Sequence, residues 1–120
     1  MKIAVGVFLA VFVFNDALAA QNSGVMRVSS IVSRDSGSHA IFFQPESYNG
    51  PYAVPDQGCA LSDRAVIVEQ TAGGGTMLQV ILSALTNSKR VLIQVDGCTP
   101  LDPATPLVTA PKVTKVQIYS

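Results

Sequence analysis

The side chains that could do chemistry in this 120-residue chain are few and scattered. His39 is the only histidine, and neither a nucleophile elbow nor an orienting carboxylate accompanies it in the sequence. Serine or cysteine hydrolysis needs a nucleophile, a base and a group that orients the base. The carboxylates are scattered, and no two fall at a spacing that argues for glycosidase chemistry. The sequence therefore predicts no catalytic residues and a protein that is not an enzyme, and a hydrolase is the disfavoured alternative.

The residues for a metal or a cofactor are equally sparse. Two cysteines and one histidine do not supply the four ligands of a structural zinc site. Gly73, Gly74 and Gly75 precede a helical pattern, but the Lys-Ser/Thr of a phosphate-binding loop does not follow them. We interpret the three glycines as a flexible entry into a helix whose start packs closely. No metal and no cofactor are expected.

The first twenty residues have the pattern of a cleaved secretory signal. A positive start at Lys2 precedes the apolar run 3–14, and Ala17-Leu18-Ala19-Ala20 supplies an A-x-A cleavage site. The apolar run is shorter than the roughly 20 residues that span a bilayer, so an uncleaved anchor is the weaker alternative. We expect a signal peptide at 1–20 and a single domain at 21–120. The mature chain is then secreted or periplasmic, without membrane insertion.

Composition and cysteine count narrow the class further. Eight basic residues balance eight acidic ones, and this excludes a protein that holds nucleic acid by bulk charge. Cys59 and Cys98 are the only cysteines, and an even count in an exported small domain predicts one disulfide. That bond closes a loop of roughly 40 residues, which is worth up to about 4 kcal/mol.

Hydrophobic patterning predicts an all-β domain with one helix. Imperfect alternation near Ser29 and Ser30 indicates a β-bulge in the first strand. Proline-rich segments at 45–58 and 99–111 are expected to be loops. The expected strands lie at 24–33, 39–44, 65–68, 90–95 and 112–119, and the expected helix lies at 74–88. Three strands, a helix and two strands form the order of the five-stranded OB-fold barrel.

The loop after the second strand gathers side chains suited to a sugar. Gln44, Glu46, Tyr48 and Tyr52 lie close together in the sequence. A tyrosine ring stacks on a sugar face, while glutamate and glutamine bond to hydroxyls. The alternative interpretation is that these are ordinary loop residues.

The mature chain resembles a known group of exported bacterial proteins over residues 22–119. The resemblance rests on Ser23-Gly24, Cys59, the helix at 76–87, the strand at 89–93, Cys98 and the ending at 111–118. These features are similar to the small exported OB-fold proteins that include the B subunits of subtilase-cytotoxin-type toxins. The resemblance implies a glycan-binding subunit that forms a homo-pentamer, binds sialylated glycans and partners a toxin A subunit. It also implies that Ser23 contacts the sugar. The alternative is a stand-alone periplasmic or secreted protein, structural or inhibitory, without a glycan site.

Overall fold

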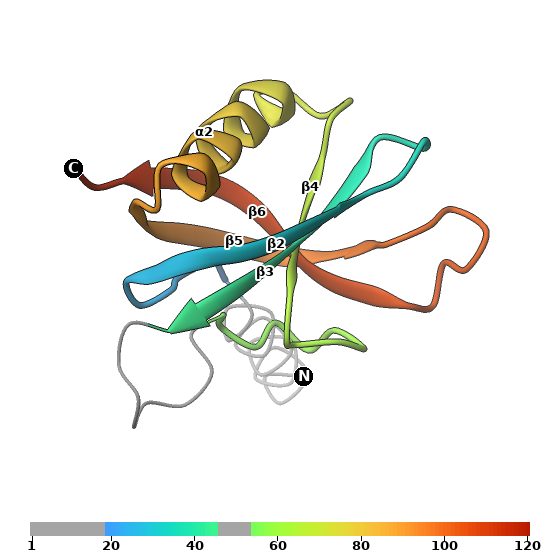
Figure 1. Cartoon of the computed structure of the whole chain (residues 1–120). Coiled ribbons are helices and arrows are strands. Elements are labelled where there is room, and N and C mark those ends of the chain that lie inside the picture. Colours follow the sequence, from blue (N-terminus) through green and yellow to red (C-terminus); the bar gives the residue numbers. More distant parts are fainter. Residues whose placement is uncertain (1–18, 46–53) are drawn as a thin grey trace, which may run out of the picture.

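The computed structural model describes residues 19–45 and 54–120 (Figure 1). The expected signal peptide falls almost entirely on residues 1–18, outside the described residues. The described part forms six strands and one helix. In chain order these are β1 Gln21–Asn22, β2 Met26–Ser33, β3 Ser38–Pro45, β4 Ala65–Val68, α2 Gly74–Thr86, β5 Arg90–Pro100 and β6 Thr109–Ile118. Apart from the two-residue β1, this is the expected order of three strands, a helix and two strands.

The strands form a closed barrel. Neighbours around it run β2, β3, β4, β6 and β5, and β5 returns to β2 through the pair Met26–Val91. All of these pairings are antiparallel except the one between β4 and β6, where Val66 lies opposite Lys112. The single helix lies between β4 and β5 in sequence. This connectivity is that of an OB-fold barrel, so the predicted fold class is confirmed.

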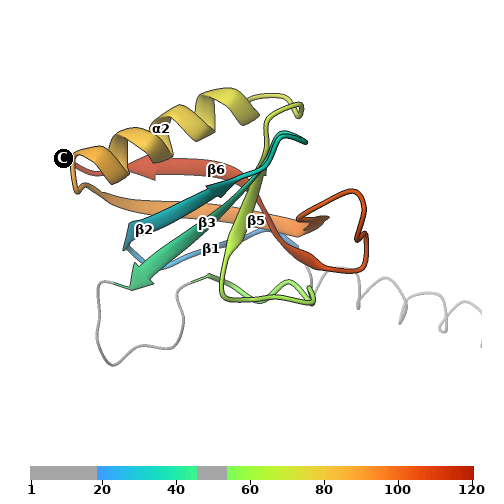
Figure 2. The same ribbon diagram turned by 45° about the vertical axis from the view of Figure 1, so that its right-hand side comes forward.

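The helix covers one end of the barrel and closes its core. Figures 1 and 2 show α2 lying across the sheet, in contact with β2, β4, β5 and β6. Leu78, Ile81 and Ala84 are buried on one face of the helix, whereas Leu82 is 44% exposed on the other. The buried face meets a core built from alternate residues of the strands. Its strand members include Met26, Val28, Ile41, Phe43, Ala65, Ile67, Val91, Ile93, Val95 and Val113.

The bulge predicted in the first strand is present, and two further irregularities alter the last hairpin. The β2–β3 register shifts between Val28 and Ser30, as expected. The β5–β6 register shifts opposite Thr114, because Gln94 pairs with Lys115 while Val95 pairs with Val113. A bulged residue reverses the alternation beyond it. Val113 and Val116 therefore both pack in the core, although strict alternation would place them on opposite faces.

The prediction that residues 99–111 form one loop is wrong. β5 continues to Pro100 and β6 begins at Thr109, so only 101–108 connects the two strands. Asp96 and Gly97 lie at a second register shift inside β5, where Gly97 adopts a φ of 73°. A proline is compatible with a strand wherever its missing N–H does not face the partner. The pairing of β5 with β6 therefore includes Pro100 and Pro111.

The predicted Cys59–Cys98 disulfide is confirmed. It joins the segment before β4 to the long strand β5, and both cysteines are in the bond. A disulfide of this kind persists in an oxidising compartment, which indicates an exported protein. Within 19–45 and 54–120, no helix has the length and apolar character needed to cross a membrane.

Candidate functional site

The structure gives Ser23 a part in holding the chain together. Its hydroxyl donates to the carbonyl of Gly24 at 2.8 Å and accepts from the backbone N–H of Ile93 at 3.0 Å. Its own N–H donates to the Ile93 carbonyl at 2.8 Å, and the residue is buried. These bonds fasten the segment before β2 to β5. The sugar contact assigned to Ser23 by resemblance stays a prediction.

Of the other expected sugar contacts, only one lies in the described part of the chain. Gln44 is exposed near the end of β3. Glu46, Tyr48 and Tyr52 lie outside the described residues. The structure therefore places Gln44 on a surface and leaves the remaining three as predictions.

Strand alternation puts Gln44 on the outside of the barrel together with Phe42. On β3, Ile41 and Phe43 point into the core, so Phe42 and Gln44 point away from it. A second apolar cluster covers this side of β3, β4 and β6. Its members are Ala40, Val66, Leu101 and Ala110, with Phe42, Leu61 and Val68 partly buried against them. We call the surface formed by Phe42, Gln44, Asp63 and Arg64 the outer face.

The outer face carries an ordered stack of charge on an aromatic ring. The guanidinium of Arg64 lies over the Phe42 ring, with its carbon 4.6 Å from the ring centroid. The same guanidinium donates twice to Asp63, at 2.8 Å from Nε and 3.0 Å from Nη2. Hydrogen bonding from Arg64 lowers the pKa of Asp63 below its usual value of 3.8. Ring and carboxylate together fix the orientation of Arg64.

Gln44 extends this arrangement along β3. It follows Phe42 by two residues on the same face, which is about 7 Å along a strand. The outer face thus offers an amide, a carboxylate, a guanidinium and part of an aromatic ring. The two charges compensate each other, so the surface favours neutral polar ligands over polyanions.

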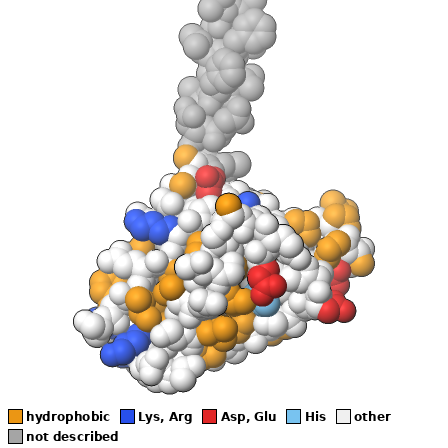
Figure 3. Space-filling model, turned by 90° about the horizontal axis from the view of Figure 1, so that it is seen from above, with side chains coloured by type: hydrophobic (Ala, Val, Ile, Leu, Met, Phe, Trp, Pro, Cys, Tyr) orange, Lys and Arg blue, Asp and Glu red, His pale blue; other side chains and the backbone are white. Residues whose placement is uncertain are grey.

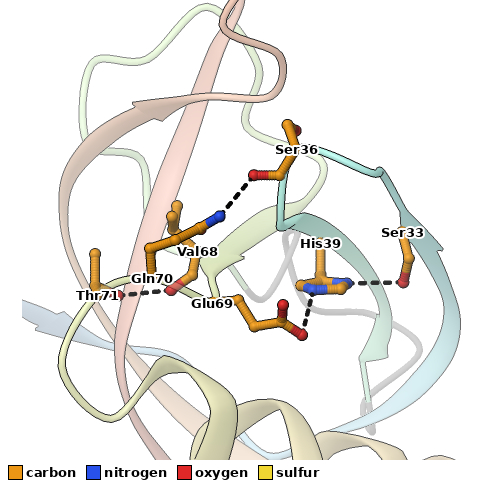
Figure 4. Close-up of polar contacts among 7 residues, drawn as sticks. All are labelled: Ser33, Ser36, His39, Val68, Glu69, Gln70 and Thr71. Carbon is orange, nitrogen blue, oxygen red and sulfur yellow. Dashed lines mark hydrogen bonds and ion pairs between the residues drawn. The ribbon is translucent and has the colours of Figure 1, made fainter.

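A different constellation lies at the other end of β3. Ser33 and His39 are directly opposite each other across the β2–β3 hairpin. The Ser33 Oγ lies 2.8 Å from Nδ1 of His39, and Oε1 of Glu69 lies 3.3 Å from Nε2 (Figure 4). The Glu69 contact has ion-pair distance but lacks hydrogen-bond geometry. We call these three residues the histidine cluster.

Burial differs sharply within the histidine cluster. His39 is 7% exposed, whereas Ser33 is exposed and the Glu69 side chain is 50% exposed. In Figure 3 the histidine appears as a small pale-blue surface beside an acidic side chain. The ring is therefore shielded, while its two partners reach solvent.

Backbone and side-chain bonds hold Glu69 in position beside the hairpin. The N–H of Glu69 donates to the Gly37 carbonyl at 2.9 Å. The neighbouring Gln70 donates from Nε2 to the Ser36 carbonyl, also at 2.9 Å (Figure 4). The turn after β4 is thereby fastened to the β2–β3 turn, and the carboxylate of Glu69 comes to face His39.

The glycine run brings the helix start against this turn. A Cβ on Gly74 would lie 2.1 Å from the backbone oxygen of Val68, which no real contact allows. Gly73 adopts a φ of 79° directly before the helix. Close packing at the helix start, predicted from the three glycines, is confirmed.

Sequence reasoning did not find Ser33 and Glu69. The pairing of Ser33 with His39 could have been found by centring the hairpin on the turn residues 34–38, which makes the two residues opposite. No local signal indicates Glu69, which lies 30 positions after His39 and reaches it only through the barrel. The case against a hydrolase relied on the lack of a nucleophile elbow and an orienting carboxylate in the sequence, whereas the barrel brings Ser33 and Glu69 to the two ring nitrogens of His39.

In the described ranges, no three His, Cys, Asp or Glu side chains gather in a way that could hold a metal ion. The fold and site define a disulfide-bonded β-barrel with a polar and aromatic outer face and a buried histidine. No protein-family model matches this chain, and no curated protein matches it either. The resemblance to toxin B subunits therefore stays a prediction.

Proposed function

We propose that this chain is an exported binding protein that holds a glycan on the outer face. The observation that carries the proposal is the ordered stack of Asp63, Arg64 and Phe42, with Gln44 exposed on the same strand as the ring. No chemistry on the ligand is assigned to this face.

The chemistry of the outer face fits a sugar. A sugar ring carries neighbouring hydroxyls and an apolar face of C–H groups. The Asp63 carboxylate accepts hydrogen bonds from hydroxyls, while the Arg64 guanidinium and the Gln44 amide donate to them. Arg64 is already oriented by two hydrogen bonds and by the Phe42 ring, so binding costs little side-chain entropy.

Fold and charge narrow the class of ligand. OB-fold barrels bind oligonucleotides and oligosaccharides on this side of the sheet and with the adjoining loops. Single-stranded nucleic acid is bound in grooves rich in positive charge, with stacked aromatic rings. Here the formal net charge is zero, and Asp63 places a carboxylate beside the one guanidinium of the face. These features favour the oligosaccharide.

Export is part of the proposal. The signal pattern at 1–20 and the oxidised cysteines support a secreted or periplasmic protein. Gln57, which is buried, donates from Nε2 at 2.8 Å to Oε1 of Gln21, the first residue after the expected signal peptide. The start of the mature chain is thus bound to the barrel close to the disulfide.

Assembly into a ring of five beside a toxin A subunit is the more specific form of the proposal. Exposed apolar side chains at the β5–β6 connection support contacts between copies, since Leu107 is 88% exposed and Val108 is 42% exposed. The native mass of the oxidised protein tests this form. A pentamer supports it, and a stable monomer contradicts a ring formed by this chain alone while leaving the glycan proposal intact.

The test of glycan binding uses immobilised glycans and matched variants. Arg64→Ala and Gln44→Ala each remove a proposed donor, and each should weaken binding at least about tenfold. Arg90→Ala is the matched control, because it removes an arginine 5.8 Å from the Tyr119 ring, away from the outer face. Gln117→Ala is the control for an exposed strand glutamine. Equal losses in the controls, or binding of oligonucleotides instead of glycans, would contradict the proposal. The absence of any ligand would favour the stand-alone structural or inhibitory role.

A further inference from the structure

We propose that the histidine cluster is a second site, in which Ser33 is a nucleophile toward carboxylic esters. The proposal is independent of glycan binding, because Ser33, His39 and Glu69 lie at the opposite end of β3 from Gln44. The required geometry is a hydroxyl within hydrogen-bonding distance of a ring nitrogen, with a carboxylate at the other nitrogen.

The carboxylate of Glu69 determines which ring nitrogen is the base. An imidazole beside a carboxylate holds its proton on the nitrogen that faces the negative charge. In this cluster that nitrogen is Nε2, 3.3 Å from Glu69. The lone pair is then on Nδ1, 2.8 Å from the Ser33 hydroxyl. In the serine proteases, Nε2 is the base and Nδ1 faces the carboxylate. Here Nδ1 is the base and Nε2 faces the carboxylate, and each role requires only a correctly placed nitrogen.

The exposure of Ser33 and the burial of His39 suit a nucleophile and its base. His39 is 7% exposed, so the ring itself is shielded from water, while the Glu69 side chain is half exposed. Ser33 is exposed, so an ester carbonyl can reach its oxygen. The contact between Glu69 and the ring has ion-pair distance without hydrogen-bond geometry, and catalytic hydrogen bonds are often poorly aligned until substrate binds.

The same turn holds polar atoms that protein groups do not satisfy. Within the described part of the chain, Arg34 Nη1 and Ser36 Oγ are buried without a hydrogen-bond partner. A buried donor without a partner costs free energy and calls for an explanation. Both residues belong to the turn that follows Ser33, and Nε2 of His39 is the third buried atom without a hydrogen-bond partner in the described residues.

The reaction is ester hydrolysis in two steps. Ser33 Oγ bonds to the ester carbonyl carbon while Nδ1 of His39 takes the hydroxyl proton. The carbon–oxygen bond to the alcohol then breaks, and the alcohol leaves with that proton. Water attacks the acyl-serine, again giving a proton to His39, and the carboxylic acid leaves as the proton returns to Ser33. Ester and water are consumed, and acid and alcohol are formed.

The experiment labels the purified, oxidised protein with an alkyl fluorophosphonate. Ser33 attacks phosphorus, His39 takes the proton and fluoride leaves. Peptide mass spectrometry identifies the labelled serine. We expect Ser33 to be labelled at least about 100-fold faster than Ser30, an exposed serine of the same strand. Equal labelling of the two serines, or no labelling at all, would overturn the proposal.

Variants separate chemistry from positioning. Ser33→Ala should abolish hydrolysis of a nitrophenyl ester. The control variant Ser30→Ala should keep the rate of the parent protein. Glu69 is a positioning residue, so Glu69→Gln should slow Ser33 labelling about tenfold or more, and Glu69→Asp should restore part of the rate. Both Glu69 variants should keep the melting temperature of the parent, because this side chain is half exposed. Labelling that is unchanged in Glu69→Gln would contradict the assigned tautomer. A substitution at His39 is not needed for the test, because this residue is buried and its replacement can prevent folding. The labelling of Ser33 in the parent protein gives the decisive result.

Discussion

The two ends of β3 carry two sites of opposite construction. At the outer face, Asp63 and Arg64 are neighbours in sequence, and their charges compensate on a largely solvent-facing surface. In the histidine cluster, Ser33, His39 and Glu69 come from three segments, and the ring between them is buried. Strand alternation separates the two sites, because His39 lies on the core side of β3 and Phe42 on the outer side.

The difference shows how burial and assembly set what each site can do. A compensated pair on the surface contributes little to stability, but it presents oriented donors and acceptors to a ligand. In the histidine cluster, a shielded imidazole lies between a hydroxyl at hydrogen-bond distance and a half-exposed carboxylate at ion-pair distance. We therefore propose recognition at the outer face and reactivity at the histidine cluster.

The largest expected effect comes from removing the disulfide. It ties the segment that leads to Asp63 and Arg64 to β5, and it does not reach the β2–β3 turn. The double variant Cys59→Ala/Cys98→Ala should lose about 2–5 kcal/mol of unfolding free energy, measured by urea denaturation. Hydrogen exchange should accelerate more at residues 60–64 than at His39. Equal acceleration at both places would show that the two regions do not respond separately.

A smaller loss of stability, which affects the histidine cluster and not the outer face, is expected from a substitution at the helix start. Gly74→Ala places a Cβ against the Val68 carbonyl, so it should cost about 1–3 kcal/mol and displace the turn that holds Glu69. Ser33 labelling should fall while glycan binding is kept. Gly75→Ala is the control, since a Cβ there meets nothing within 4 Å and alanine favours the helix by about 0.5–1 kcal/mol. A stable Gly74→Ala protein with normal labelling would contradict the assigned packing.

The smallest effect is the pH dependence of the Asp63–Arg64 pair. Arg64 lowers the pKa of Asp63 in the folded protein, so the pair stabilises the fold fully above the unfolded value of 3.8. That contribution is lost as the pH falls below about 4 through the lower folded pKa. Because Asp63 is about half exposed, the effect should stay below about 1 kcal/mol. Thermal unfolding between pH 2 and 6 should show the parent and Asp63→Asn converging in acid. Asp35→Asn, outside both sites, serves as the control.

Local signals in the sequence predicted most of the fold. The β2 bulge, the strand Ala65–Val68, the helix start at Gly74 and the disulfide could all be predicted, because each depends on neighbouring residues or on cysteine count. The length of the β5–β6 hairpin could not, because its prolines indicated a loop and the bulges become visible only when two strands are paired.

The residues of the two candidate sites also differ in whether local sequence could predict them. Gln44 was found because it lies near a suspected loop, and its exposure is set by simple alternation on β3. The partnership of Arg64 with Phe42 depends on the barrel, which brings the start of β4 beside β3. Glu69 reaches His39 only through the pairing of β4 with β3 and the turn that follows it. Long-range assembly of this kind leaves no mark in local sequence.

The most direct test of the central claim is a map of backbone amide chemical shifts during titration with a bound glycan. Binding on the outer face predicts that the largest shifts occur at Phe42, Gln44, Asp63 and Arg64, with little change at Ser33, His39 and Glu69. Arg64→Ala should remove these shifts, and Arg90→Ala should leave them. Shifts centred on the histidine cluster or on the β5–β6 connection, with the outer face unchanged, would contradict the assignment of recognition to the outer face.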